Sequence, residues 1–243
     1  MRSSLSRRLA AEFLGTGFLV AAVVGSGIMA ERLANGNVAL ALLANTIATG
    51  AALVTLILTF GPISGAHFNP AVSIADAMEG GLTRRDLGGY IAVQVLGGIA
   101  GAVAAHAMFG LPFLFLSLRA RSGPSQFLSE FIAAFGLLCV IWGCSRSDSS
   151  SGMIPFAVGS YITAAYWFTA STSFANPAVT IARAVSNTFA GIRPRDVPLF
   201  VVAQILGAIA ATMLFRWLVP ALPAKAKNVV VPHELAITKA PRR

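Results

Sequence analysis

Two copies of one polar tripeptide are the residues whose type and spacing most suggest chemistry. The copies are Asn69-Pro70-Ala71 and Asn176-Pro177-Ala178. Asparagine followed by proline favours the start of a helix, because the side chain caps free N–H groups and proline presets φ at the first helical position. Each amide also has N–H donors that can bond a passing solute oxygen. One copy would be an ordinary helix cap, whereas two copies in corresponding halves of the chain predict a polar pathway.

Two glutamates form a second candidate set. Glu12 and Glu130 occur in similar apolar contexts, as Ala-Glu-Phe and Ser-Glu-Phe. A carboxylate inside a membrane is costly and suggests function. Proton coupling is one interpretation, and the favoured one is that each glutamate accepts N–H bonds from a non-helical segment in its own half. His67 is expected either to line the cytoplasmic mouth of a pore or to hold the first of these segments in place.

The remaining reactive groups do not form a catalytic pattern. Cys139 and Cys144 lie in one apolar run, without His, Asp or Glu at ligand spacing, and are expected to be small buried hydrophobes. The sequence contains no nucleophile–base pair and no metal-ligand cluster. We therefore expect no enzyme activity, no metal and no cofactor.

The elements that must hold these residues are membrane helices. The chain has 243 residues, of which 56% are hydrophobic and 11% charged, and its mean hydropathy is +0.75. A soluble domain has about 25% charged residues, and a spanning helix needs about 20 mainly apolar ones. We predict six spans, at about 9–30, 38–60, 88–109, 127–145, 153–171 and 197–219.

Two of the charge-free stretches, 33–75 and 149–182, are too long for one span, and the surplus of each carries an Asn-Pro-Ala. From Pro70 to Met78 a helix would be about 13 Å long, roughly half of the hydrocarbon core. Repeated motifs in the two halves indicate an inverted duplication, in which two half-helices meet at the midplane. We predict one channel domain over 1–220, with repeats at about 9–109 and 127–219, and a cytoplasmic tail over 221–243.

The cations indicate orientation. The chain has 18 Lys and Arg against 9 Asp and Glu, and basic residues concentrate on cytoplasmic loops. Twelve of the 18 fall on the side of the two termini and six on the other side. We therefore expect a multi-pass inner-membrane (cytoplasmic-membrane) protein, embedded in the lipid bilayer with both termini in the cytoplasm. No basic run is interleaved with aromatic residues, so a nucleic-acid partner is not expected.

This organisation resembles the aquaporin (major intrinsic protein) family, up to about Pro220. The match is carried by the twin tripeptides, by the Ser-Gly-Ala-His-Phe-Asn-Pro-Ala-Val run and by the Ala-Glu-Phe-Leu-Gly-Thr start. The resemblance implies an all-α membrane fold of six transmembrane helices and two re-entrant half-helices, assembled as a homotetramer with one pore per subunit. It also implies passive permeation of small uncharged solutes.

The narrowest part of the pore is where the chain departs from the family pattern. Family members usually carry arginine directly after the second Asn-Pro-Ala, and this chain has Val179 there. By spacing, the other walls of the selectivity filter fall at Thr49, Tyr166 and Ser173. Loss of an arginine removes a fixed cation and five donors, so the constriction should be wider and more apolar. Arg183, one helical turn further on, is expected at the outer vestibule rather than in the missing place.

A wide filter favours solutes larger than water, among them metalloid acids such as arsenite and small polyols. A valine at the position of Val179 is similar to the altered filters of metalloid-permeable members of the family. An ordinary water channel is the alternative within the same class. A proton-coupled secondary transporter would also use inverted repeats and broken helices, and a scaffold without a pore would leave the paired asparagines unexplained.

Overall fold

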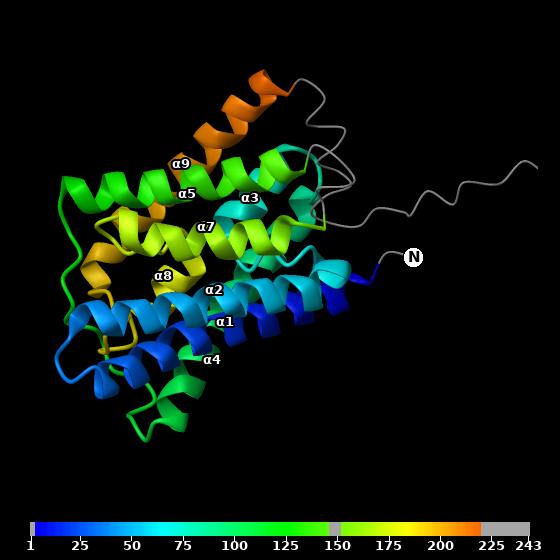
Figure 1. Cartoon of the computed structure of the whole chain (residues 1–243). Coiled ribbons are helices and arrows are strands. Elements are labelled where there is room, and N and C mark those ends of the chain that lie inside the picture. Colours follow the sequence, from blue (N-terminus) through cyan, green and yellow to red (C-terminus); the bar gives the residue numbers. More distant parts are fainter. Residues whose placement is uncertain (1–2, 146–151, 220–243) are drawn as a thin grey trace, which may run out of the picture.

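The computed structural model describes residues 3–145 and 152–219, and this part of the chain is all-α (Figure 1). The long helices are α1 (Leu5–Leu33), α2 (Val38–Ser64), α4 (Arg84–Met108), α5 (Pro124–Cys144), α7 (Ile154–Phe168) and α9 (Val197–Leu218). Two short helices, α3 (Pro70–Met78) and α8 (Pro177–Arg183), begin at the two Asn-Pro-Ala motifs, and the 3-10 turn η1 (Pro194–Asp196) precedes α9. The predicted tail, 221–243, lies outside the described residues.

Each predicted span corresponds to a long helix, and five of the described helices are long and apolar enough to cross a membrane. The fifth prediction, 153–171, was too long at its C-terminal end, because α7 has 15 residues and ends at Phe168. Thr169 has extended backbone angles, since the chain turns here into the non-helical segment that leads to the second motif. The chain is a multi-pass membrane protein.

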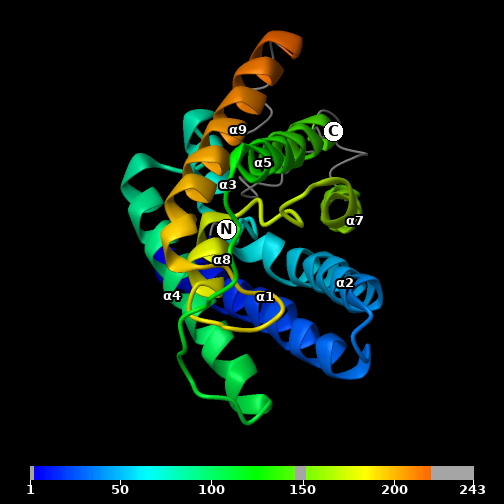
Figure 2. The same cartoon turned by 90° about the vertical axis from the view of Figure 1, so that its left-hand side faces the viewer.

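The helices pack in two similar groups. α1 lies against α2 and α4, and α5 lies against α7 and α9, while α2 and α7 close the bundle between the groups. The short helices cross over, since α3 contacts both α4 and α9, and α8 contacts the same two helices. Figure 2 shows α3 and α8 enclosed by the long helices. The two motifs, far apart in sequence, therefore meet in the interior.

Glycines allow the long helices to approach closely. A Cβ atom on Gly97 would collide with the backbone of Phe13, and one on Gly101 with the backbone of Gly17. Gly207 of α9 faces the backbone of Phe131 in the same way. Small residues at such crossings let membrane helices pack backbone to backbone. This packing fixes α4 and α9, the two helices on which the short helices rest.

The outer surface of the bundle is apolar. Phe18, Ile47, Met213 and Trp217 are among the large hydrophobic side chains that are more than half exposed. Side chains of this type on the outside of a bundle match a lipid environment, in which backbone polar groups must be satisfied inside the helices. The apolar outer surface therefore fits a membrane, and many polar side chains, such as Glu12, Gln94 and Glu130, are buried inside the bundle.

One end of the bundle, here called the distal face, is formed by residues 34–37, 109–123 and 184–196, on the left of Figure 1 and opposite the N-terminus. Backbone hydrogen bonds join its two longer loops, from Phe115 N to Val185 O, from Ser117 N to Ala184 O and from Arg193 N to Arg119 O. These bonds hold the residues that follow α8 firmly against the end of the bundle.

Candidate functional site

The two segments that lead into the short helices have the same unusual backbone. Ala66 and Phe68 in the first segment have φ values of 50° and 48°, and Ser173 and Ala175 in the second have 48° each. A left-handed conformation is unfavourable for residues other than glycine, by about 1–3 kcal/mol each. Such strain persists only where the surroundings enforce it. The surroundings that enforce it here are two buried carboxylates.

Glu12 on α1 supports the first segment. Its side chain is fully buried, and its two oxygens accept four hydrogen bonds. The donors are Ser64 Oγ at 2.6 Å, His67 N at 3.0 Å, Phe68 N at 2.7 Å and Gln94 Nε2 at 2.8 Å. Charged acceptors make the stronger hydrogen bonds, so one carboxylate holds the segment and ties it to α4.

Glu130 on α5 supports the second segment in the same way. It accepts bonds from Phe174 N and Ala175 N, both at 2.9 Å, and from Gln204 Nε2 at 2.6 Å. Gln94 and Gln204 each also donate to a hydroxyl of a short helix, on Ser73 and Thr180. Each carboxylate is thus occupied by donors from its own half of the molecule.

The two asparagines cap their own helices and also connect them. Asn69 Oδ1 accepts from Ala71 N at 2.9 Å, and Asn176 Oδ1 accepts from Ala178 N at 3.0 Å. The amide of Asn69 donates to the carbonyl of Ala175 at 2.8 Å, and that of Asn176 donates to the carbonyl of Phe68 at 2.7 Å. Each side-chain amide therefore donates one N–H to the opposite segment and has a second N–H available. Both asparagines line a central cavity.

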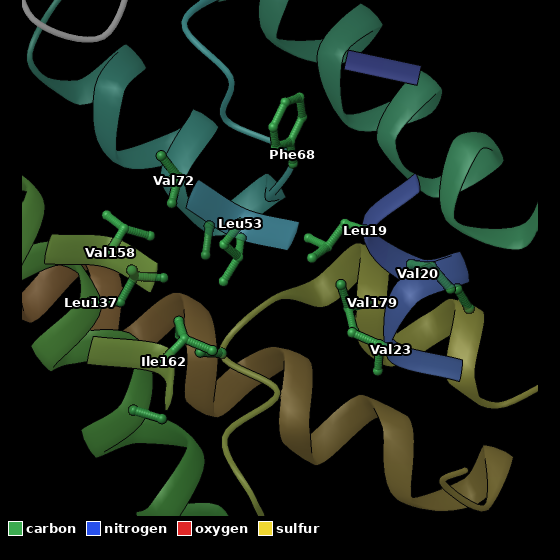
Figure 3. Packing of buried hydrophobic residues seen from close by; sticks show 14 of the residues in the cluster. Leu19, Val20, Val23, Leu53, Phe68, Val72, Leu137, Val158, Ile162 and Val179 are labelled. Atoms are coloured by element: carbon green, nitrogen blue, oxygen red, sulfur yellow. The ribbon is translucent and has the colours of Figure 1, made fainter. Parts of the chain in front are cut away.

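This cavity has a volume of about 340 Å³ and runs between α1, α2, α5, α7 and the two segments. Its walls are mainly apolar, with Leu53, Leu137 and Ile162 among them, and Figure 3 shows these side chains pointing toward a common centre. The positive ends of α3 and α8 meet beside it. A mostly apolar passage with a few convergent donors is typical of a site for small polar solutes.

All four residues predicted for the constriction line this cavity. Thr49 Oγ1 and Tyr166 Oη are 3.2 Å apart, so the register counted for Tyr166 brings these two hydroxyls together. Ser173 Oγ is buried and has no hydrogen-bond partner among the described residues. Val179 lies beside Leu19 and Val23 in Figure 3, so an apolar side chain stands directly after the second motif.

His67, in the segment that leads into α3, lies close to Asp76 of α3. His67 lines the cavity, and its Nδ1 is 2.9 Å from Ser73 Oγ. Its Nε2 is 3.6 Å from a carboxylate oxygen of Asp76, which is fully buried and does not line the cavity. Asp76 and Arg183 both stand seven residues after their motif asparagine, yet only Arg183 reaches the cavity.

Phe174 lines the cavity and Arg121 stacks on its ring, and no pattern in the sequence predicts either role. The Arg183 guanidinium carbon lies 3.3 Å from the centre of the Phe174 ring, and that of Arg121 lies 4.9 Å from it. Arg121 also donates to the carbonyls of Ser171 and Gly191, at 2.9 Å each. Burial and the neighbouring Arg119 lower the pKa of Arg121 to about 10, so it is charged at neutral pH.

Comparison with known proteins gives consistent matches. The sequence profile of the family described as Major intrinsic protein matches residues 1–175 and 153–240. A relative in Rhizobium meliloti (strain 1021), aquaglyceroporin AqpS, is 60% identical over 220 residues, covering 90% of this chain and 93% of the relative. Aquaporin NIP3-1 of Oryza sativa subsp. japonica is 32% identical over 219 residues, 87% of this chain and 68% of the relative.

Among solved structures, the aquaglyceroporin from Plasmodium falciparum superposes with a TM-score of 0.69 at 21% sequence identity. The match covers 91% of this chain and 100% of that structure. At this identity the likeness establishes the fold alone, which is the six-span arrangement with two half-helices that the sequence predicts.

Proposed function

The chain belongs to the major intrinsic protein family and is a membrane channel for small neutral solutes rather than an enzyme, and we propose that its constriction favours solutes larger than water. The proposed solutes are small hydroxylated molecules, namely metalloid acids such as arsenite and small polyols such as glycerol. The observation that carries this proposal is Val179, an apolar side chain at the cavity wall directly after the second motif.

The proposed pathway follows the central cavity. A solute oxygen bonds the free N–H of Asn69 and Asn176 in place of lost hydration, while the facing positive helix ends oppose protons and cations. Thr49 and Tyr166 offer hydroxyls that both donate and accept, which suits a solute with several hydroxyl groups. Val179 leaves room that a longer cationic side chain would fill, so a solute wider than water can pass.

The carboxylate geometry favours a channel over proton-coupled transport. Coupling requires a carboxylate that is free to bind and release protons in the pathway. Glu12 and Glu130 are instead occupied by several donors each, and neither lines the cavity. We propose that both support the re-entrant segments, and that His67 helps to hold the first segment while lining the cytoplasmic mouth.

The same proposal covers the arrangement in the cell. The chain would form one channel domain over 1–220 with a tail over 221–243, and would lie in the cytoplasmic membrane with both termini inside. The expected assembly is a homotetramer with one pathway per subunit. The sum of cations on the side of the termini supports this orientation.

The filter assignment is tested by Val179→Arg in proteoliposomes, with swelling followed by stopped flow under gradients of water, glycerol and arsenite. We expect glycerol and arsenite flux to fall about tenfold or more, because the arginine would occupy the space that a large solute needs, while water flux is kept or raised. Val185→Arg is the matched control, since this half-buried residue beyond α8 does not line the cavity. Unchanged glycerol and arsenite flux in Val179→Arg would show that the constriction lies elsewhere.

A further inference from the structure

Arg183 is a buried cation that faces the cavity without a carboxylate partner. It is the last residue of α8 and is 2% exposed. Its Nε donates to the carbonyl of Ala190, and its planar face stacks on Phe174. Its two Nη groups make no hydrogen bond within residues 3–145 and 152–219, and no ion pair involving Arg183 is found there.

A buried charge is normally paired, because transfer of an unpaired ion out of water is costly. The described residues that line the cavity include no aspartate, glutamate or lysine, and Arg183 is the single arginine among them. The two Nη groups of the guanidinium are therefore available to bind a solute in the cavity. Guanidinium groups bind oxygen pairs of carboxylates and phosphates in a bidentate manner.

A second unsatisfied group lines the same cavity. Ser173 Oγ is buried, lines the cavity and has no partner among the described residues. Ser173 directly precedes Phe174, on which Arg183 stacks, and all three residues line the cavity. A hydroxyl can donate to an oxygen that the guanidinium also bonds, or accept from a protonated one. The pair thus suits a ligand with at least two oxygens on one atom.

The surroundings of this pair are positive. Arg121 stacks on the same Phe174 ring, and its other bonds go to backbone carbonyls, which leave its charge in place. The carboxylates at this end of the bundle are already engaged, since Glu31 of α1 pairs with Arg119 at 3.2 Å and Asp196 of the distal face pairs with Arg193 at 3.0 Å. Positive potential in a low-dielectric mouth raises the local concentration of anions and repels cations.

We propose that Arg183, at the distal mouth of the cavity, and Ser173, in the wall of the constriction, together form a solute-binding subsite that takes small oxyacids and binds their singly charged anions most tightly. This inference rests on the proposed channel function and adds a specificity-determining cation to it. Arg183 does not replace the missing filter arginine, since it stands one turn further out. It receives the solute before the constriction at Val179, and its charge turns cations away from a constriction that has lost its own.

A purely structural role for Arg183 is the competing explanation, because its Nε bond ties the end of α8 to the loop at Ala190. The test must therefore measure binding as well as flux. The probe is methylphosphonate, an oxyanion small enough for the cavity, titrated calorimetrically into the full chain in lipid nanodiscs. The same anion is added as an inhibitor of glycerol flux in proteoliposomes.

We expect methylphosphonate to bind the native chain and Arg183→Gln to weaken binding at least tenfold. Arg183→Lys keeps the charge without the planar fork and should weaken binding less than Arg183→Gln does. Ser173→Ala should weaken it about twofold to tenfold, as for loss of one hydrogen bond. Arg195→Gln removes the same charge from an exposed position of the same face and should change binding less than twofold.

The proposal is overturned if the native chain does not bind methylphosphonate, or if Arg183→Gln and Arg195→Gln weaken binding equally. If Arg183→Gln fails to fold, unchanged binding in both Arg183→Lys and Ser173→Ala overturns it as well. Binding that depends on Arg183 without any glycerol or arsenite flux would contradict the proposed solutes and support the subsite. Normal glycerol and arsenite flux without anion binding would support the proposed solutes and contradict the subsite.

Discussion

Replacement of Glu12 by glutamine preserves the shape of the side chain and removes half of its acceptor capacity. Each carboxylate oxygen accepts two bonds, and the amide nitrogen can take the place of only one oxygen. If it takes the place of Oε2, Gln94 can turn its own amide and offer Oε1, which has no partner among the described residues. The N–H of Phe68 then loses its acceptor, and the Nε2 group of Gln94 turns toward the buried position where Oε1 had no partner.

A buried unpaired N–H costs about 1–3 kcal/mol, so we expect the free energy of unfolding to fall by at least that amount. Glu130→Gln should cost the same, because Gln204 can turn in the same way and one backbone N–H of the second segment loses its acceptor. Glu31→Gln is the control. Its side chain is 51% exposed and paired with Arg119, so the change should be within about 0.5 kcal/mol.

The assay is denaturation in detergent micelles followed by circular dichroism, with swelling of proteoliposomes measured on the same preparations at several pH values. Supporting carboxylates predict lower stability and a glycerol flux whose pH dependence is that of the native chain. If Glu12→Gln were as stable as the native chain but lost a pH dependence that the native chain shows, the carboxylate would titrate during transport, and the supporting role would be refuted.

Two further predictions concern packing and the motif itself. Gly101→Ala should lower the free energy of unfolding by about 2 kcal/mol or more, because its Cβ would collide with the backbone of Gly17; Gly88→Ala, which meets nothing within 4 Å, should not lower it, and equal losses in denaturation would refute this packing. Asn69→Ala should cost about 0.5–2 kcal/mol for the lost cap and also lower water permeability, since the bond to Ala175 O holds the two segments together; native permeability in a destabilised variant would separate the cap from the pathway.

Much of the fold was predictable, because its signals are local or repeated. Asn69 and Asn176 mark helix starts by residue type alone, and both begin helices. The apolar stretches gave six spans because lipid requires long uninterrupted helices. Tyr166 could be placed by counting from Pro155, since a helix keeps its register over that distance, and its hydroxyl lies beside Thr49.

The remaining features depend on contacts between distant segments. No local pattern indicates that the Asn69 amide bonds the carbonyl of Ala175, because that bond exists only once the two halves have met. The end of α7 at Phe168 is set by the path of the second segment rather than by a helix-breaking residue. The place of Arg121 on the Phe174 ring likewise depends on how a long loop crosses the distal face.

The most direct test of the central claim, a passive channel for small uncharged solutes, is the initial rate of solute entry into proteoliposomes against the size of the gradient. A channel predicts glycerol and arsenite rates that rise in proportion to the gradient, without saturation at millimolar concentrations and without change when a proton gradient is imposed or collapsed. Saturable entry, or accumulation against the solute gradient driven by protons, would contradict the claim and identify a coupled transporter instead.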